Sequence, residues 1–194
     1  ILYMVVMVLF VTVGYIAQKR DFHYGILITE FLLIALPTLI YVRIKGASIK
    51  KELRFNSLSI IDALLVIVTA ISAYFAAVFI NLIAEIIISM AGDLIIPDIP
   101  FAQNPREYVI LLFIIAGSAG ICEEILFRGF IMRSCEKLGM WRSIIMTALL
   151  FSVLHLNIQN IVAPLFLGII FGFMVYKTNS IYAGMLAHFI NNSV

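Results

Sequence analysis

The stretch Ala116–Gly129, which reads AGSAGICEEILFRG, places two adjacent carboxylates and an arginine inside an otherwise apolar segment. The run Tyr108–Ile121, which leads up to the carboxylates, contains no charged residue. An ionisable group at membrane depth is costly, so it needs a charged partner, a water-filled cavity or a function. We therefore expect Glu123, Glu124 and Arg128 to lie at the functional site.

The composition is typical of a helical membrane protein. Hydrophobic residues make up 63% of the 194 residues and charged residues 12%, and the mean hydropathy is +1.12. Soluble domains are closer to one half apolar and one quarter charged. The apolar residues also form blocks of membrane-spanning length. The predicted fold class is therefore all-α, a polytopic transmembrane helical bundle. The expected partner is the lipid bilayer and not nucleic acid, because no basic patch interleaved with aromatic residues occurs.

About seven hydrophobic segments are predicted along the chain. They cover residues 1–17, 25–44, 60–92, 108–137, 141–156, 161–176 and 181–194. We interpret them as one integrated membrane domain. Residues 1–107 supply N-terminal transmembrane helices and a basic cytoplasmic loop, and residues 108–194 supply the helical core that carries the charged motif.

Three further expectations concern single positions. Pro37 is expected to kink the second segment, where neighbouring helices accommodate it. Cys122 and Cys135 fall too far apart on one predicted helix to pair, so both are predicted to be free thiols. The last segment rises only about 21 Å as a helix, short of a roughly 30 Å bilayer core. We therefore expect the sequence to be part of a longer protein.

The charges of the loops predict an orientation in the membrane. Loops 43–54 and 128–142 are basic, whereas loop 93–107 is acidic. Cytoplasmic loops carry the Lys/Arg excess, so the two basic loops are predicted to be cytoplasmic. At 1.5 Å per residue, the carboxylates and two later histidines lie about 16–20 Å from the basic helix ends. We therefore predict a polar intramembrane cavity that opens towards the cytoplasmic side.

The helical spacing divides the charged motif into a pair and a free carboxylate. Glu124 and Arg128 are four residues apart, so they share a helix face and are predicted to pair. Glu123 is rotated about 100° from its neighbour and cannot share that partner easily. We therefore expect Glu123 to be available for chemistry, with Glu124 and Arg128 in support.

Two later segments supply matching polar groups. His155 follows Phe151 by one helical turn, and Asn192 follows His188 by one turn. A carboxylate, two imidazoles and an amide around a cavity suit peptide hydrolysis. Glu123 and His155 can hold and deprotonate a water, while His188 and Asn192 can donate to a developing oxyanion. Phe151 is expected to form part of the cavity wall.

The same side chains leave a zinc site open as an alternative. Glu123, His155 and His188 could ligate zinc, with a water in the fourth position. However, these ligands come from three separate helices, and the His-Glu-x-x-His pair of many zinc proteases does not occur. We therefore predict a mechanism without a cofactor.

Three motifs together resemble a known family. They are EEILFRG at Glu123–Gly129, FSVLH at Phe151–His155 and HFINN at His188–Asn192. In this order they resemble the CPBP family of the Abi superfamily, which comprises CAAX prenyl endopeptidases and bacteriocin-processing or bacteriocin-immunity proteins. The resemblance covers roughly Tyr108–Val194. The first hundred residues are similar only in being apolar spans with a basic loop.

The resemblance implies an intramembrane endopeptidase in a prokaryotic cell membrane, acting on a membrane protein or peptide that is possibly of the prenylated CAAX type. By this analogy Glu123 and His155 activate water, and His188 and Asn192 form the oxyanion site. The prenyl endopeptidase branch resembles a metal-free glutamate protease. Two non-proteolytic readings stay open: a membrane scaffold or bacteriocin-immunity protein, and a transporter, since intramembrane Glu and His residues also build proton relays.

Overall fold

The computed structural model describes residues 1–95 and 102–193, and the regular structure within these ranges is entirely helical. Four helices are long and apolar enough to cross a membrane: Leu2–Arg20, Phe22–Ile44, Ile60–Ser89 and Pro105–Leu138. The protein is therefore a multi-pass membrane protein. All seven predicted segments form helices, but the last three are only 15, 17 and 13 residues long.

The first two long helices form an N-terminal hairpin. Its segments are α1 (Leu2–Leu9), the π-helical η1 (Phe10–Gly14), α2 (Tyr15–Arg20), α3 (Phe22–Leu27), the π-helical η2 (Ile28–Ala35) and α4 (Leu36–Ile44). The side chain of Asp21 caps α3 by accepting a hydrogen bond from the Tyr24 amide at 2.9 Å, so the second segment begins three residues before the predicted start at Gly25. Pro37 lies in the first turn of α4, directly after the wide π-helical turns of η2.

The hairpin is joined to the rest of the bundle by a basic loop that contains α5 (Ile49–Glu52). Arg54 in this loop is buried and pairs with Glu136, and its carbonyl accepts a hydrogen bond from the Ile181 amide at 2.9 Å. Burial and the nearby charge of Arg133 lower the pKa of Arg54 to about 10, against the opposing effect of Tyr176. Arg54 is therefore still charged at neutral pH. Its side chain connects the loop to the helix that carries Glu136, and its backbone carbonyl connects the loop to the helix that starts at Ile181.

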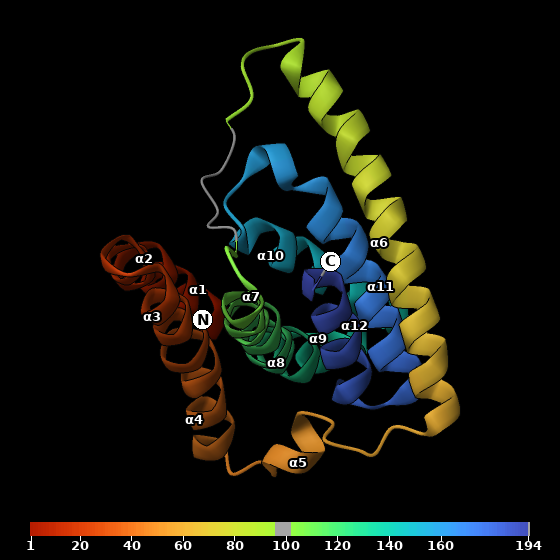
Figure 1. Ribbon diagram of the computed structural model, residues 1–194. Coiled ribbons are helices and arrows are strands. Elements are labelled where there is room, and N and C mark those ends of the chain that lie inside the picture. Colours follow the sequence, from red (N-terminus) through yellow and green to blue (C-terminus); the bar gives the residue numbers. More distant parts are fainter. Residues whose placement is uncertain (96–101, 194) are drawn as a thin grey trace.

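The third long helix, α6 (Ile60–Ser89), runs along the outside of the bundle (Figure 1). Its start is fixed by Ser59, whose hydroxyl accepts a hydrogen bond from the Asp62 amide at 3.0 Å. A helix of 30 residues is about 45 Å long, so α6 exceeds the bilayer core by several turns. The small buried residues Ala70, Ala73 and Ala77 allow α6 to pack closely against the C-terminal helices.

The fourth long helix carries the charged motif. It consists of α7 (Pro105–Leu111), η3 (Leu112–Gly117), α8 (Ser118–Glu124), η4 (Ile125–Ile131), α9 (Met132–Cys135) and the final 3-10 turn η5 (Glu136–Leu138). Gly139 ends it with φ of 97°, a left-handed backbone conformation that glycine adopts without strain. The π-helical η3 and η4 flank α8, and such turns are frequent at functional sites.

Three short helices complete the bundle around α8. They are α10 (Met140–Leu154), α11 (Val162–Thr178) and α12 (Ile181–Ser193), with a 3-10 turn η6 (Ile158–Asn160) between the first two. In Figure 1, α11 and α12 lie between α6 and the charged helix. Both cysteines, Cys122 and Cys135, are free thiols as predicted.

Candidate active site

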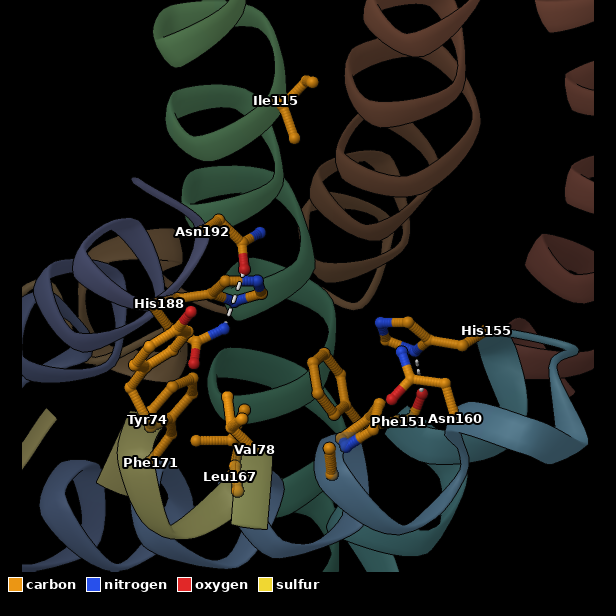
Figure 2. Close-up of a pocket in the computed structure, with 14 residues that line it drawn as sticks. Tyr74, Val78, Ile115, Phe151, His155, Asn160, Leu167, Phe171, His188 and Asn192 are labelled. Atoms are coloured by element: carbon orange, nitrogen blue, oxygen red, sulfur yellow. Dashed lines mark hydrogen bonds between the residues drawn. The ribbon is translucent and has the colours of Figure 1, made fainter. Parts of the chain in front are cut away.

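A cavity of about 410 Å³ lies where α6, α10, α11 and α12 meet the charged helix (Figure 2). Its wall combines aromatic and aliphatic side chains with two imidazoles and several amides. The lining residues are Tyr74, Ala77, Val78, Ile115, Phe151, His155, Asn160, Ala163, Pro164, Leu167, Phe171, His188, Asn191 and Asn192. A mostly apolar cavity with a few convergent polar groups is the usual form of a ligand site.

The centre of the site is a fully buried trio of charged and polar side chains. Arg128 Nη1 donates to Glu124 Oε1 at 2.7 Å, as the four-residue spacing predicts. The same oxygen is 3.0 Å from His188 Nδ1, so Glu124 joins the long helix to α12 without releasing its arginine. Arg128 Nη2 also donates to the carbonyl of Gly168 at 3.3 Å. The trio therefore ties three helices together beneath the cavity.

Aromatic rings cover the charged trio. The guanidinium carbon of Arg128 lies 4.5 Å from the centre of the Phe151 ring and 5.6 Å from that of Phe171. Phe151 also packs edge-on against both imidazoles, with centroid distances of 5.0 Å to His155 and 5.7 Å to His188. Such cation–π contacts lower the cost of burying an arginine. Phe151 thus forms the wall that the sequence predicts and also shields the ion pair.

Glu123 has no ion-pair partner on its own helix. It is only 8% exposed, and its Oε2 atom is buried without a hydrogen-bond partner among the described residues. The nearest ring nitrogen of His188, Nε2, lies 3.7 Å from this oxygen, which is beyond direct hydrogen-bond range. The separation of Glu123 from the arginine agrees with the sequence prediction. Glu123 is not among the residues that line the cavity, and it adjoins the cavity through His188, which does line it.

His155 is positioned by the end of its helix. It forms the C-cap of α10, and its Nδ1 is 3.0 Å from the carbonyl of Phe151. Because a carbonyl can only accept, Nδ1 must carry a proton, which leaves Nε2 with a lone pair when the ring is neutral. His155 is exposed and lines the cavity across from His188 (Figure 2). Within residues 1–95 and 102–193, no hydrogen bond links it to Glu123.

Asn192 reaches the cavity from the last turn of α12. Its Oδ1 accepts a hydrogen bond from Asn191 Nδ2 at 3.0 Å (Figure 2), which orients its own amide nitrogen as a remaining donor. Both asparagines line the cavity, so the full-turn spacing from His188 does not by itself separate them. The hydrogen bond uses one of the two N–H groups of Asn191 and neither of those of Asn192, and the choice of Asn192 as the oxyanion donor stays a prediction.

Two glycines allow α12 to approach α8. A Cβ on Gly120 would lie 3.3 Å from the Phe189 amide nitrogen, so the absence of a side chain lets the two helices lie close together just before Glu123. A Cβ on Gly184 would overlap Glu124 Oε2 and would lie 2.8 Å from Val175 Cγ2. The sequence analysis missed Gly184, because nothing in its neighbourhood marks it as facing a carboxylate.

Glu30 is a second residue that the sequence analysis missed. It lies on η2, is only 6% exposed, and has a buried Oε2 without a hydrogen-bond partner among the described residues. It interacts electrostatically with Glu123, because η2 packs against α8. The available signal was its position as the single charged residue inside an apolar span, which is costly in a membrane.

The predicted zinc alternative requires Glu123, His155 and His188 to converge. The 3.7 Å between Glu123 Oε2 and His188 Nε2 suits two ligands of one ion, but a third ligand is lacking. No set of three His, Cys, Asp or Glu side chains is placed to hold a metal in the part of the chain that the structure describes. The residues as placed therefore do not fit the three-ligand site.

The cavity lies at one end of the short helices. Phe151 and His155 are at the C-terminal end of α10, Pro164 is in the first turn of α11, and Asn192 is in the last turn of α12. His155 and Asn160 are exposed there. The mouth of the cavity is therefore at the end where α10 stops and α11 starts.

The basic residues are at the opposite end of the same helices. Arg142 is in the first turn of α10, Lys177 is in the last turn of α11, and Arg54 bonds to Ile181 at the start of α12. The residues that line the cavity and the basic residues are therefore at opposite ends of these helices, and the predicted opening towards the cytoplasmic side stays a prediction. Counting residues from the basic ends gives the depth of the two histidines along their helices. It does not show that α10 and α12 end next to the cavity.

Residues 105–194 match the family described as type II CAAX prenyl endopeptidase Rce1-like. The match begins at the start of the charged helix and includes the glutamates, both histidines and Asn192, so the recognition of the family from its three motifs is confirmed. Comparisons with curated proteins and with solved structures found no match.

Proposed function

We propose that this chain, a member of the type II CAAX prenyl endopeptidase Rce1-like family over residues 105–194, is an intramembrane endopeptidase. It hydrolyses a peptide bond in a membrane-associated protein or peptide, with prenylated proteins of the CAAX type as the candidate substrates that the family match suggests. The observation that supports this most directly is the buried carboxylate of Glu123. Its Oε2 atom has no hydrogen-bond partner among the described residues and lies 3.7 Å from Nε2 of His188, which lines the cavity together with His155 and Asn192.

In the proposed reaction, Glu123 takes a proton from a bound water. The resulting hydroxide adds to the carbonyl carbon of the scissile bond, and the carbonyl oxygen becomes an oxyanion. The gap of 3.7 Å between Glu123 Oε2 and His188 Nε2 is wider than a direct hydrogen bond and fits a bridging group. When the tetrahedral intermediate collapses, the proton held by Glu123 passes to the leaving amine and the C–N bond breaks.

The two histidines are proposed to have different roles because their bound nitrogens have different partners. His155 Nδ1 donates to a backbone carbonyl, so its Nε2 can accept a hydrogen bond from the attacking water. His188 Nδ1 faces the carboxylate of Glu124, which can only accept, so Nδ1 donates and Nε2 carries a second proton only when the ring is charged. Only that charged form presents Nε2–H as a donor to the oxyanion, together with the amide of Asn192.

The supporting groups are proposed to act through His188. Glu124 fixes the orientation of the imidazole, and Arg128 holds Glu124 in place from the other side. Residues 108–194 would then form the catalytic core. Residues 1–107 would supply the surrounding helices and one wall of the cavity, through Tyr74 and Val78 of α6.

The experiment that tests this function is a cleavage assay on membrane proteins of the source cell. Glu123→Gln keeps the side-chain size but removes the base, so cleavage should fall about a thousandfold. Glu52→Gln on α5, far from the cavity, is the matched control and should cleave normally. If the wild type cleaves nothing, and the wild type and Glu123→Gln bind a membrane peptide equally, the protein is a scaffold or immunity protein and not a protease.

The proposed mechanism uses no metal. Purified protein dialysed against a strong chelator should therefore keep its activity and contain substoichiometric zinc by elemental analysis. Loss of activity that zinc alone restores would instead assign Glu123, His155 and His188 as ligands in a rearranged site.

We also propose that the protein resides in a prokaryotic cell membrane with its basic loops in the cytoplasm. Cytoplasmic access, predicted from the sequence, would require the mouth to lie at the basic end. Its position at the other end supports access from the opposite side. In a Cys135→Ser background, an impermeant maleimide added to intact cells should label Ile158→Cys near the mouth and not Lys177→Cys. The reverse pattern would place the mouth in the cytoplasm.

A further inference from the structure

A second cavity of about 360 Å³ adjoins the active-site cavity. It lies between the C-terminal part of α6 and the turn η6. Its lining residues are Asn81, Glu85, Leu94, Ile95, Asn157, Gln159 and Asn160. We call it the amide pocket, because four of these residues are amides. Asn160 lines both cavities, so the amide pocket is a direct continuation of the active site.

One face of α6 runs along both cavities. Tyr74, Ala77 and Val78 line the active-site cavity, and Asn81 and Glu85 line the amide pocket. Spacings of three and four residues place all five on one side of a helix. The eleven steps of the helix from Tyr74 to Glu85 rise about 16 Å, which equals about five residues of an extended peptide. The two cavities together therefore have the length of a short substrate segment.

The polar atoms of the amide pocket are only partly used by the protein. Asn81 Nδ2 donates to Glu85 Oε1 at 2.8 Å, but Asn81 Oδ1 is buried with no hydrogen-bond partner among the described residues. A buried, unpaired carbonyl oxygen requires an explanation. The second carboxylate oxygen of Glu85 is not used by Asn81, so the pocket has acceptors left for a donor from outside.

The turn η6 is built so that its own amides face the pocket as donors. Asn157 Oδ1 accepts from the Gln159 amide at 3.0 Å, and Gln159 Oε1 accepts from the Ile95 amide at 3.1 Å. These bonds fix the two side chains by their oxygens. Across residues 1–95 and 102–193, their amide nitrogens form no hydrogen bond, so they remain available for carbonyl groups of a ligand.

We propose that the amide pocket is a substrate subsite for an extended peptide segment that carries a positively charged group, a Lys or Arg side chain, a few residues from the scissile bond. The carboxylate of Glu85 and the free oxygen of Asn81 bind the cation. The amides of Asn157 and Gln159 bind the peptide backbone. This proposal rests on the proposed peptide-cleaving function of the adjoining cavity and adds a substrate preference to it.

The charge of the pocket favours a cationic group over a neutral one. Among the described residues that line the pocket, Glu85 is the one carboxylate, and none is Lys or Arg. It is partly buried, so an incoming cation would be only partly screened by water. Hydrogen bonds to charged groups are stronger than those between neutral groups, and an effect of about tenfold on affinity is expected.

The test measures binding without cleavage. Glu123→Gln protein in lipid nanodiscs is titrated with fluorescein-labelled, N-acetylated apolar peptides that place Lys, Gln or Glu at successive positions. Lys should bind about tenfold more tightly than Gln at one position, and Glu more weakly than Gln. Adding Glu85→Gln should abolish this preference, and Glu85→Lys should reverse it in favour of the Glu peptide. Adding Glu52→Gln is the matched control and should leave the preference unchanged.

A preference for Lys that persists in the Glu85→Gln protein would overturn the proposal, as would equal binding of the Lys, Gln and Glu peptides. If only peptides with a free N-terminal amine bind in a Glu85-dependent way, the subsite recognises a chain terminus and the proposal of a basic side chain is overturned. Thermal unfolding of each variant verifies folding. Because no cleavage is needed, a failure here is distinct from a failure of the protease assignment, which the Glu123→Gln assay tests in wild type.

Discussion

Two pairs of a buried arginine with a glutamate occur at opposite ends of the short helices, and only one of them adjoins the candidate site. Arg54 and Glu136 pair at the basic end, while Arg128 and Glu124 pair beneath the cavity. Both arginines are almost completely buried. A buried ion pair in this protein is therefore not by itself a sign of function.

The difference lies in the third partner of each pair. Glu136 is also held by the exposed Arg133, at 2.8 Å, so that cluster closes on itself at the surface. Glu124 is instead held by His188, whose other nitrogen faces the unpaired Glu123. In the Arg54–Glu136 pair, the third partner is another permanent cation, Arg133. In the Arg128–Glu124 pair, the third partner is His188, a side chain that can gain or lose a proton.

The largest expected difference between the two pairs is the effect of replacing each arginine on stability and cleavage. Arg128→Met leaves Glu124 as a fully buried charge, so it should lower the free energy of unfolding by about 3–5 kcal/mol and abolish cleavage. Arg54→Met should cost less, about 2 kcal/mol, because Glu136 keeps Arg133 and is partly solvated. Activity per folded molecule should survive Arg54→Met. Equal losses of stability and activity in both variants, measured by unfolding in detergent and peptide cleavage, would remove the distinction.

A smaller change tests the geometry of Glu124 without removing any charge. In Gly184→Ala the new methyl group overlaps Glu124 Oε2, so the carboxylate must move away from His188. A displacement of this kind should lower kcat about a hundredfold. Gly117→Ala on the charged helix is the control, because its Cβ would meet Phe113 at 3.8 Å and the Leu112 carbonyl oxygen at 3.9 Å, both ordinary van der Waals contacts. Wild-type kcat in Gly184→Ala would show that His188 does not depend on the position of Glu124.

The smallest expected effect concerns the unpaired carboxylate in the N-terminal hairpin. Glu30→Gln replaces a buried carboxylate beside Glu123 with a neutral group of the same size. Because an uncompensated buried charge is unfavourable, the variant should be more stable by about 1 kcal/mol. Thermal unfolding in detergent measures this. A loss of stability would mean that the Glu30 carboxylate has a favourable partner in the membrane. Glu30 would then be a paired carboxylate like Glu124 and not an unpaired one like Glu123.

The sequence by itself determined the features that depend on residues close together in the chain. The seven apolar segments coincide with helices because length and apolar composition are local properties. The contact between Glu124 and Arg128, and the separation of Glu123 from it, follow from the 100° turn between helical neighbours. The three motifs were sufficient to recognise the family.

Tertiary structure alone decided which residues meet across helices. The bond between Glu124 and His188, the glycine that makes room for it, and the approach of Glu30 join positions far apart in the sequence. Packing also placed the cavity at the ends of α10 and α12, away from the basic loops. The physical reason is that helical periodicity fixes the direction of a side chain only relative to its own helix. Its neighbours depend on how whole helices pack, and no short stretch of sequence encodes that.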